Sequence, residues 1–266
     1  MSGLIIYTKK EAARNKRYID WVINAAKSQG LELTLVLKED IEKNGFNSLI
    51  TVEFAINRTR DYNISLILEL QGVRVFNNSL ITLIGNNKLA GYRYIKGLGV
   101  KFPKIFGDYR EKDKFLSKPI CESGGQGIKL SEGGDNLKIT QELVENVYGD
   151  IRFYIIGNKI RHCIRRYSSD LIAVNYSLGG EFEKYNYSDE LKDLVELILS
   201  QIKIDYGSVD LLVTKSGEVY FNEIEDVVGS RMLSELGIND TTKEYIKYIK
   251  GELRKWEQRQ RAYSTM

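Results

Sequence analysis

The chain has 266 residues, of which 39 are Lys or Arg and 36 are Asp or Glu, so its formal net charge at pH 7 is +3. A charge this close to balance gives no support for nucleic acid as a partner, which would need a basic surface. The 42% of apolar residues can fill a core, and the length suits one compact protein of two or three lobes.

Cysteine and histidine are scarce, which excludes several kinds of site. The two cysteines, Cys121 and Cys163, are too few for a disulfide scaffold and lack the clustered ligands of a zinc site, so we expect reduced thiols. The single histidine, His162, rules out a catalytic histidine pair. No apolar run approaches the roughly 18–20 residues that cross a bilayer, and the run near residue 5 is too short for a signal peptide. We therefore expect a cytoplasmic protein with no membrane partner.

Strands and helices alternate in the first third of the chain. Short apolar runs predict strands over residues 3–7, 31–37, 54–57 and 73–76, and apolar residues at helical spacing predict helices over 14–29 and 64–70. This alternation is typical of a parallel sheet whose faces are covered by helices.

Beyond residue 100 the pattern changes to short strands joined by turns that contain glycine. After a helix over 86–97, we predict strands over 115–119, 128–130, 139–144, 151–156 and 159–166, which indicate an antiparallel region. An amphipathic helix over 189–202 precedes a hairpin of strands 208–213 and 218–224, and another amphipathic helix covers 241–261.

A lysine followed by a glycine-rich stretch is the first feature that suggests chemistry. Lys118 is predicted at a strand end, and Gly124, Gly125 and Gly127 follow it. Glycine lets main-chain N–H groups approach phosphate oxygens, and lysine supplies a positive charge. On its own, the stretch is more typical of a hairpin turn with a surface lysine.

The second feature combines an apolar segment, residues 141–144, with a carboxylate at Asp150. Main-chain groups of such a segment are suited to read an adenine edge, and a nearby carboxylate is suited to accept hydrogen bonds from a ribose. On its own, the segment is more typical of an ordinary strand–turn–strand with a surface pair of Asp150 and Arg152.

Three carboxylates in the last quarter of the chain form the third feature. Glu223 and Glu225 are two apart on one predicted strand and therefore share a face, and Asp210 on the preceding strand can lie opposite them. Three converging carboxylates repel one another unless a hard cation such as Mg²⁺ lies between them. The alternative is a solvated acidic hairpin, although apolar neighbours place these residues beside a core.

The order of these features resembles the ATP-grasp superfamily, and most of all its RimK-like branch of carboxylate–amine ligases. Glu225 stands where that branch has Asn, and residues 226–231 replace its Ser-Ser-Pro-Gly, which leaves the metal number and the substrates open. Over residues 54–232, the segments similar to family motifs are, in order, GVRVFNNSLITLIGNNKLAGYRYIKGLGVKFPKIF, KPICESGGQGI, QELVENVYGDIRFYIIGNKIRHCIRR, NYSLGG and DLLVTKSGEVYFNEIE.

The resemblance implies an α/β (α+β) fold of the ATP-grasp type with three lobes. The first is a Rossmann-like parallel-sheet subdomain over residues 1–84. The second is a small lid over 85–146. The third is an antiparallel-sheet subdomain over 147–266 that carries the metal site and the terminal helix.

The resemblance also implies roles for basic and amide side chains. Lys88 and Lys118 would neutralise the α- and β-phosphates of ATP, and Arg165 would face the γ-phosphate. Asn175 would assist at the metal and phosphate, and Arg152 is a further catalytic candidate.

The metal ligands implied by the resemblance are Asp210, Glu223 and Glu225, which would hold one or two Mg²⁺ ions, or Mn²⁺. Arg58, Arg152 and Arg231 are candidates for gripping a substrate carboxylate, with surface ion pairs as the alternative. The remaining nucleotide-binding candidates are Glu122, Ser123, Gly124, Gly125, Gln126 and Gly127 over the phosphates, Gln141, Glu142, Leu143 and Val144 at the adenine, and Asp150 at the ribose.

The activity implied by the resemblance is an ATP- and Mg²⁺-dependent ligation. A carboxylate becomes an acyl phosphate and is then joined to an amine, with a small molecule, amino acid or peptide on either side. Two alternatives share the nucleotide-binding residues: a kinase that does not ligate, and a regulator without turnover. A Rossmann-like oxidoreductase is disfavoured because no G-x-G-x-x-G follows the first strand. A homo-oligomer is left open.

Overall fold

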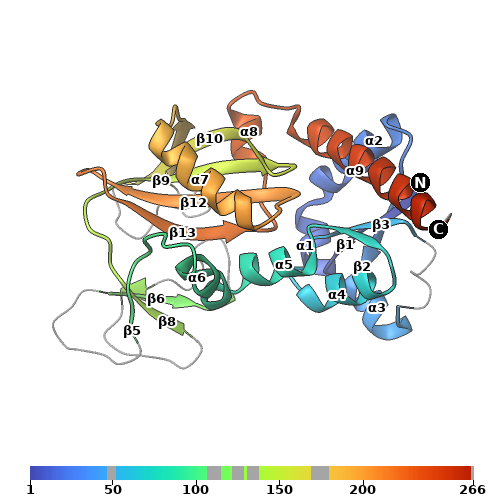
Figure 1. Ribbon diagram of the computed structural model, residues 1–266, viewed down its shortest axis with the longest axis horizontal. Helices are drawn as coiled ribbons and strands as arrows, with labels where there is room; N and C mark the ends of the chain where they lie inside the picture. Colours follow the sequence, from blue (N-terminus) through green and yellow to red (C-terminus); the bar gives the residue numbers. More distant parts are fainter. Residues whose placement is uncertain (47–51, 107–114, 122–128, 131–137, 169–179, 265–266) are drawn as a thin grey trace. The chain divides into compact units, whose positions relative to one another are not determined.

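The computed structural model describes residues 1–46, 52–106, 115–121, 129–130, 138–168 and 180–264. These residues belong to two compact units (Figure 1). The first unit consists of residues 1–82 and 229–266, and the second unit consists of residues 83–228. The division into three lobes stays a prediction; the two units group the chain differently and include the terminal helix in the first unit.

The first unit is built on a four-stranded parallel sheet, as the sequence predicted. The strand order is β2-β1-β3-β4, and each pair of neighbours runs in the same direction. Buried apolar runs form the central strands, because a parallel sheet covered on both faces leaves little room for polar side chains. The strands are β1 (Ser2–Tyr7), β2 (Glu32–Leu37), β3 (Phe54–Asn57) and β4 (Arg74–Phe76).

Helices cover both faces of this sheet. On one face, Leu4 and Val75 belong to the same apolar core as Ile41 of α3 and Leu68 of α4. On the opposite face, Phe76 makes an edge contact with Tyr248 of α9, at 6.3 Å between ring centroids. The helices of this unit are α1 (Lys9–Arg14), α2 (Lys16–Ser28), α3 (Lys38–Asn44), α4 (Tyr62–Leu70), the start of α5 (Ser79–Asn86), α8 (Arg231–Glu235) and α9 (Thr241–Ser264).

The predicted helix over 14–29 begins later than the sequence indicated. Asn15 ends α1 and precedes α2, and its side-chain Nδ2 donates to the main-chain oxygen of Glu11. Such a local bond from an Asn side chain competes with the helical pattern, which explains the break. The helices α1, α3, α5 and α8 were not predicted, and each of them is short, with five to eight residues.

Gly3 on β1 lies against the ring of Phe54 on β3. A Cβ atom at Gly3 would come within 2.4 Å of that ring, whereas a Cβ at Gly251 in α9 would meet nothing within 4 Å. We expect Gly3→Ala to lower the free energy of unfolding by about 1–3 kcal/mol through overpacking. The control Gly251→Ala should raise it by about 0.5–1 kcal/mol through helix propensity. Urea unfolding measures both, and a neutral Gly3→Ala would contradict this packing.

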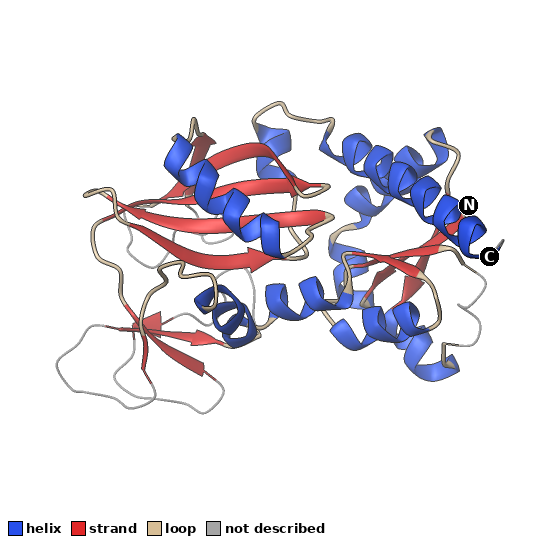
Figure 2. Ribbon diagram, in the orientation of Figure 1, coloured by secondary structure: helices blue, strands red, loops and turns tan. Residues whose placement is uncertain are grey.

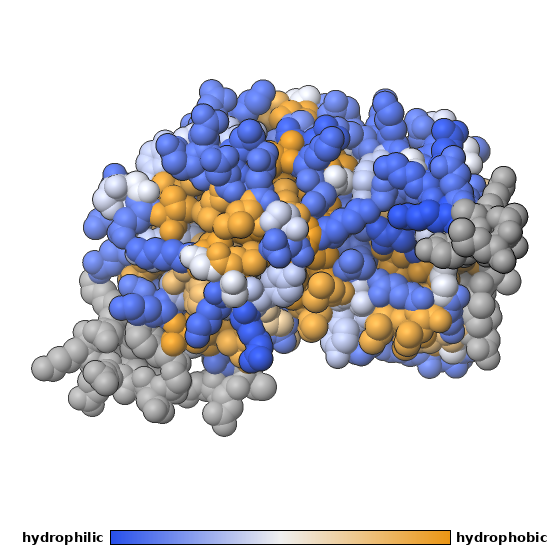
Figure 3. Space-filling view, in the orientation of Figure 1, coloured by the Kyte–Doolittle hydropathy of each residue, from blue (hydrophilic) through white to orange (hydrophobic). Residues whose placement is uncertain are grey.

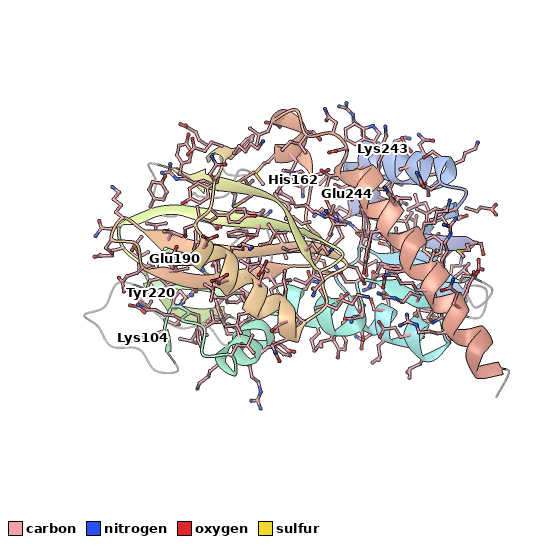
Figure 4. All side chains as sticks on the ribbon, turned by 45° about the horizontal axis from the view of Figure 1, so that its top comes forward. Lys104, His162, Glu190, Tyr220, Lys243 and Glu244 are labelled. Carbon is pink, nitrogen blue, oxygen red and sulfur yellow. The ribbon has the colours of Figure 1, made fainter. Side chains whose placement is uncertain are left out.

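The second unit contains a five-stranded antiparallel sheet with the order β11-β10-β9-β12-β13, which confirms the predicted antiparallel region. The helix α7 (Asp189–Gln201) lies over it (Figure 2). Ser188 caps this helix, with Glu190 in its first turn (Figure 4). The strands are β9 (Val147–Ile156), β10 (Lys159–Tyr167), β11 (Glu181–Lys184), β12 (Tyr206–Thr214) and β13 (Val219–Glu225).

A smaller four-stranded sheet and the helix α6 complete the second unit. The sheet has the order β5-β8-β6-β7, and all its pairs are antiparallel. The side chain of Asn87 caps α6 by accepting from the N–H of Ala90. The elements are α6 (Lys88–Lys96), β5 (Ile105–Phe106), β6 (Phe115–Pro119), β7 (Lys129–Leu130) and β8 (Lys138–Glu142).

Apolar side chains also reach the surface. Figure 3 shows apolar surface over α4, where Leu66 and Leu70 are exposed. Among the described residues, no helix combines the length and the apolar character needed to cross a membrane.

Candidate functional site

The hairpin of β12 and β13 brings the predicted carboxylates onto one face. Asp210 pairs with Glu223, and Ser208 pairs with Glu225. The register shifts immediately after Asp210, where a bulge follows in the ladder. Asp210 also pairs with Arg152 on β9, so that three strands contribute charged side chains to one face of the sheet.

Asp210 lies at the centre of a buried ion network. Its side chain is inaccessible to solvent, and it accepts from Arg152 Nε at 3.0 Å and from Arg152 Nη2 at 2.6 Å. Arg166 Nη2 donates to the same carboxylate at 2.6 Å, and Ser208 Oγ donates at 2.9 Å. Burial opposes ionisation of Asp210, but the two guanidinium groups outweigh it and hold the pKa of this carboxyl below its usual value.

The network continues through Asp150 to Lys118. Arg166 pairs with Asp150 at 2.8 Å, and Asn222 Nδ2 donates to Asp150 at 3.2 Å. Lys118 Nζ donates to Asn222 Oδ1 at 3.4 Å. Asp150 and Lys118 are both buried, so neither of them is the surface residue that the alternative interpretation of the sequence expected.

Arg166 is the residue that sequence reasoning missed. The prediction chose its neighbour Arg165, but adjacent residues on a strand point to opposite faces. Arg165 donates to Tyr148 O and pairs with Glu183 at 2.9 Å, whereas Arg166 faces Asp150 and Asp210. Alternation along β10 places Arg165 and Arg166 on opposite faces, and the register of β9 and β10, which pairs Asp150 with Arg166, shows that Arg166 is the one beside the carboxylate.

A pocket in the second unit is lined by both positively and negatively charged side chains. It is lined by residues 84–86 of α5, Lys88 of α6, Cys121 after β6, and residues 221–225 of β13. The N–H of Lys88 donates to Ile120 O at 3.1 Å, which ties α6 to the end of β6. A Cβ at Gly85 would come within 2.9 Å of Asp226, so α5 reaches this wall closely only because the residue is glycine.

Electrostatic interactions couple the two lysines to the carboxylates at this pocket. Burial lowers the pKa of Lys118 to about 8, with the positive charge of Lys88 adding to the effect and Glu223 opposing it. Burial also raises the pKa of Glu223, and Lys88 opposes that rise. A group that carries phosphate charge would oppose the lowered pKa of Lys118, because it favours the protonated lysine, whereas a cation would oppose the raised pKa of Glu223.

The predicted adenine segment is linked to the same pocket through Tyr92. Gln141 Nε2 donates to Tyr92 Oη at 3.0 Å, and the Tyr92 ring packs edge-on against Phe221 at 6.0 Å between centroids. Leu143 and Val144 are buried just after β8. The main-chain N–H of Glu142 donates to Lys104 O at 2.8 Å.

A family model, the RimK-like ATP-grasp domain, matches residues 117–249. That range covers half of the chain and includes the buried network and most of the pocket. The chain belongs to the RimK-like ATP-grasp family.

Known proteins agree with this assignment over most of the chain. The uncharacterized protein MG011 homolog of Mycoplasma pneumoniae is 24% identical over 250 residues, which cover 88% of this chain and 87% of that protein. The glutamate–LysW ligase ArgX of Sulfolobus acidocaldarius is 24% identical over 214 residues, 70% of this chain and 76% of that protein. The D-alanine–D-alanine ligase of Bacillus anthracis, solved with ATP, is 15% identical and has a TM-score of 0.72, with 98% of this chain and 99% of that chain covered. The fold is therefore that of ATP-grasp ligases, and this member of the family is an ATP-dependent ligase that joins a carboxylate to an amine.

The remaining residues predicted from the family resemblance fall in two places. Glu122, Ser123, Gly124, Gly125, Gln126, Gly127 and Asn175 lie outside the described residues. Arg58 and Arg231 belong to the first unit. Arg58 is buried at the end of β3 with its guanidinium over the Tyr18 ring, and Arg231 is exposed at the start of α8. His162 lies on β10 (Figure 4), as expected.

The pocket offers some of the carboxylate ligands that a divalent cation requires. Glu223 and Glu225 both line the pocket, and Mg²⁺ commonly uses one or two carboxylates together with substrate phosphates. Asp210 instead turns to two arginines, and no group of three carboxylate, imidazole or thiol side chains that could hold a metal ion occurs within the described ranges. Glu223 fits a metal ion that arrives with a nucleotide, whereas Glu225 is paired with Arg152 at 2.5 Å.

Proposed function

We propose that this ligase binds Mg²⁺ and ATP at the pocket of the second unit and joins an amino acid or peptide carboxylate to an amine. The observation that carries the proposal is a pocket lined by both Lys88 and Glu223, with the buried Lys118 close enough to interact electrostatically with each of them. Opposite charges at one pocket suit a nucleotide polyphosphate together with its cation, whereas either sign alone would suit only one of them.

Different residues at the pocket are assigned to the phosphates and to the cation. Lys88 and Lys118 neutralise phosphate oxygens of the nucleotide, which lowers the barrier to attack on the γ-phosphorus. Glu223, with Glu225 beside it in the pocket lining, would hold Mg²⁺, which would supply positive charge to neutralise phosphate oxygens. Arg166 pairs with Asp150 and Asp210 and opposes the rise that burial gives to the pKa of Asp150, and it replaces Arg165 as the arginine that we assign to the site.

The reaction follows in two steps that balance. A carboxylate oxygen of the donor attacks the γ-phosphorus, the bond to ADP breaks, and an acyl phosphate forms. The amine then attacks the acyl carbon, phosphate leaves, and a proton is released from the nitrogen. Phosphoryl transfer depends on positioning and charge neutralisation rather than on a protein nucleophile, which suits a chain with one histidine.

The proposed substrate class is an amino acid or a peptide. Support comes from a relative whose name describes glutamate as its substrate, the glutamate–LysW ligase ArgX. Arg58 and Arg231 remain proposals for a carboxylate grip. Arg152 is not proposed for that role, because its guanidinium already binds Asp210 and Glu225.

A screen of ADP release tests the function. Amino acids and short peptides are supplied with Mg²⁺ and ATP, singly and in pairs, and we expect release that requires both a carboxylate and an amine. Glu223→Gln should lower kcat/KM by about 100-fold or more because the cation loses its carboxylate. The matched control Glu218→Gln, at an exposed turn where Glu218 pairs with Lys101 at 2.7 Å, should keep full turnover.

Two outcomes would change the assignment. Turnover with one substrate to a stable phosphorylated product would replace ligation by a kinase reaction. Wild-type turnover in Glu223→Gln would remove Glu223 from the metal site.

A further inference from the structure

Arg152 occupies the space between two carboxylates that a metal ion would otherwise share. Its Nη2 lies 2.6 Å from Asp210 Oδ2 and 2.5 Å from Glu225 Oε2, while its Nε lies 3.0 Å from Asp210 Oδ1. One guanidinium therefore joins the β12 carboxylate to the β13 carboxylate. The planar fork of arginine suits such bridging better than a lysine would.

The hydrogen-bonding capacity of Asp210 is already used by protein groups. Oδ1 accepts from Arg152 and Ser208, and Oδ2 accepts from Arg152 and Arg166. Asp210 and Arg152 are 0% and 5% exposed, so water cannot replace these bonds when they break. A metal ion could bind Asp210 only by displacing a buried cation, which would leave that cation without a partner at a large cost.

The charges around the network are balanced without a metal ion. Arg152 and Arg166 face Asp150, Asp210 and Glu225, and the Lys118 and Lys88 ammonium groups stand beside the remaining carboxylate, Glu223. A second divalent ion beside Arg152 would meet a positive charge at close range in a water-poor environment, where repulsion is strong. Among the described residues that line the pocket, Glu225 forms an ion pair with an arginine, whereas Glu223 interacts chiefly with Lys88.

We propose that Arg152 is a resident cation that takes the place of a second metal ion, that Glu225 positions Arg152, and that the site holds a single divalent ion through Glu223. The inference rests on the proposed nucleotide site. It assigns Glu225, which stands where the family branch has Asn, to the arginine rather than to the metal.

Counting bound Mn²⁺ tests this directly. Electron paramagnetic resonance measures free Mn²⁺ during titration of the full chain in the presence of a non-hydrolysable ATP analogue. We expect one ion per chain in the wild type and one in Glu225→Gln. Glu223→Gln should bind the ion about 10–100-fold more weakly. Two ions in the wild type, no bound ion, or loss of the ion in Glu225→Gln would each overturn the inference.

Removing the resident cation gives the converse test. Arg152→Met removes the guanidinium that Asp210 and Glu225 share, while Arg166 and Ser208 still donate to Asp210, so a second Mn²⁺ should bind if the variant keeps the wild-type circular dichroism spectrum. A folded variant that still binds one ion would overturn the inference, and if the variant does not fold, the counts above decide. Counting ions does not require turnover, so the two proposals can fail separately. An absence of ADP release with every substrate pair would contradict the proposed function, whereas the number of bound Mn²⁺ ions would still test the role of Arg152.

Discussion

Arg166→Met is expected to lower the free energy of unfolding by about 3–5 kcal/mol and to abolish ligase turnover. Arg166 is 3% exposed and neutralises two buried carboxylates, Asp150 at 2.8 Å and Asp210 at 2.6 Å. Its removal leaves the Asp150 carboxylate with a hydrogen bond from the Asn222 amide at 3.2 Å in place of the ion pair, and a buried carboxylate that loses its ion pair is costly. Urea unfolding and the ADP-release assay measure the two effects.

Arg165→Met provides the matched comparison on the same strand. Arg165 pairs with Glu183 at the surface and lies over the rings of Tyr148 and Tyr167 at 3.6 and 4.6 Å. An exposed ion pair and exposed cation–π contacts together contribute about 1–2 kcal/mol. Equal losses of stability in the two variants would contradict the assignment of Arg166, rather than Arg165, to the buried network.

Nucleotide affinity is expected to fall as the pH rises above about 8, the pKa to which burial lowers Lys118 in the free protein. Above that pH the side chain is neutral and cannot neutralise a phosphate, so the KM for ATP should rise by up to about tenfold per pH unit. Lys118→Met should weaken ATP binding by about 100-fold at pH 7 and remove this pH dependence. Steady-state kinetics between pH 6.5 and 9.5 measure the effect.

The lowered pKa of Lys118 also predicts how the free energy of unfolding changes with pH. Its ordinary pKa is 10.5, so between about pH 8 and that value the unfolded chain binds a proton that the folded chain does not. The contribution of Lys118 to the free energy of unfolding therefore rises with pH across this window, by at most about 1.4 kcal/mol per pH unit. Lys118→Met should lack the rise. The control Lys101→Met removes an exposed lysine paired with Glu218 and should keep it. If the free energy of unfolding of the wild type did not rise with pH relative to that of Lys118→Met, the burial and the lowered pKa of Lys118 would be contradicted.

Much of the fold followed from local sequence patterns. The strands over 54–57 and 115–119 have the predicted bounds: the first is a short apolar run that ends at a polar residue, and the second ends at a proline. The change from alternating strands and helices to consecutive strands correctly separated the parallel sheet from the antiparallel ones. The spacing of Glu223 and Glu225 correctly placed both side chains at one pocket.

Pairing between distant strands decided what the sequence left open. Arg152 and Asp210 are 58 residues apart, and Arg166 and Asp210 are 44 apart, so no local period relates them. Only the register of β9, β10 and β12 shows that Arg166 points toward the carboxylates and that Arg165 points away.

By itself, the sequence determined the ATP-grasp resemblance, the types of sheet and the side chains that gather at the pocket. The tertiary structure decided how their charges are paired, and it gave Asp210 and Glu225 to Arg152. The physical reason is that periodicity assigns a side chain to a face of its own strand, whereas the energy of a buried charge depends on which opposite charge the neighbouring strands bring within a few ångströms.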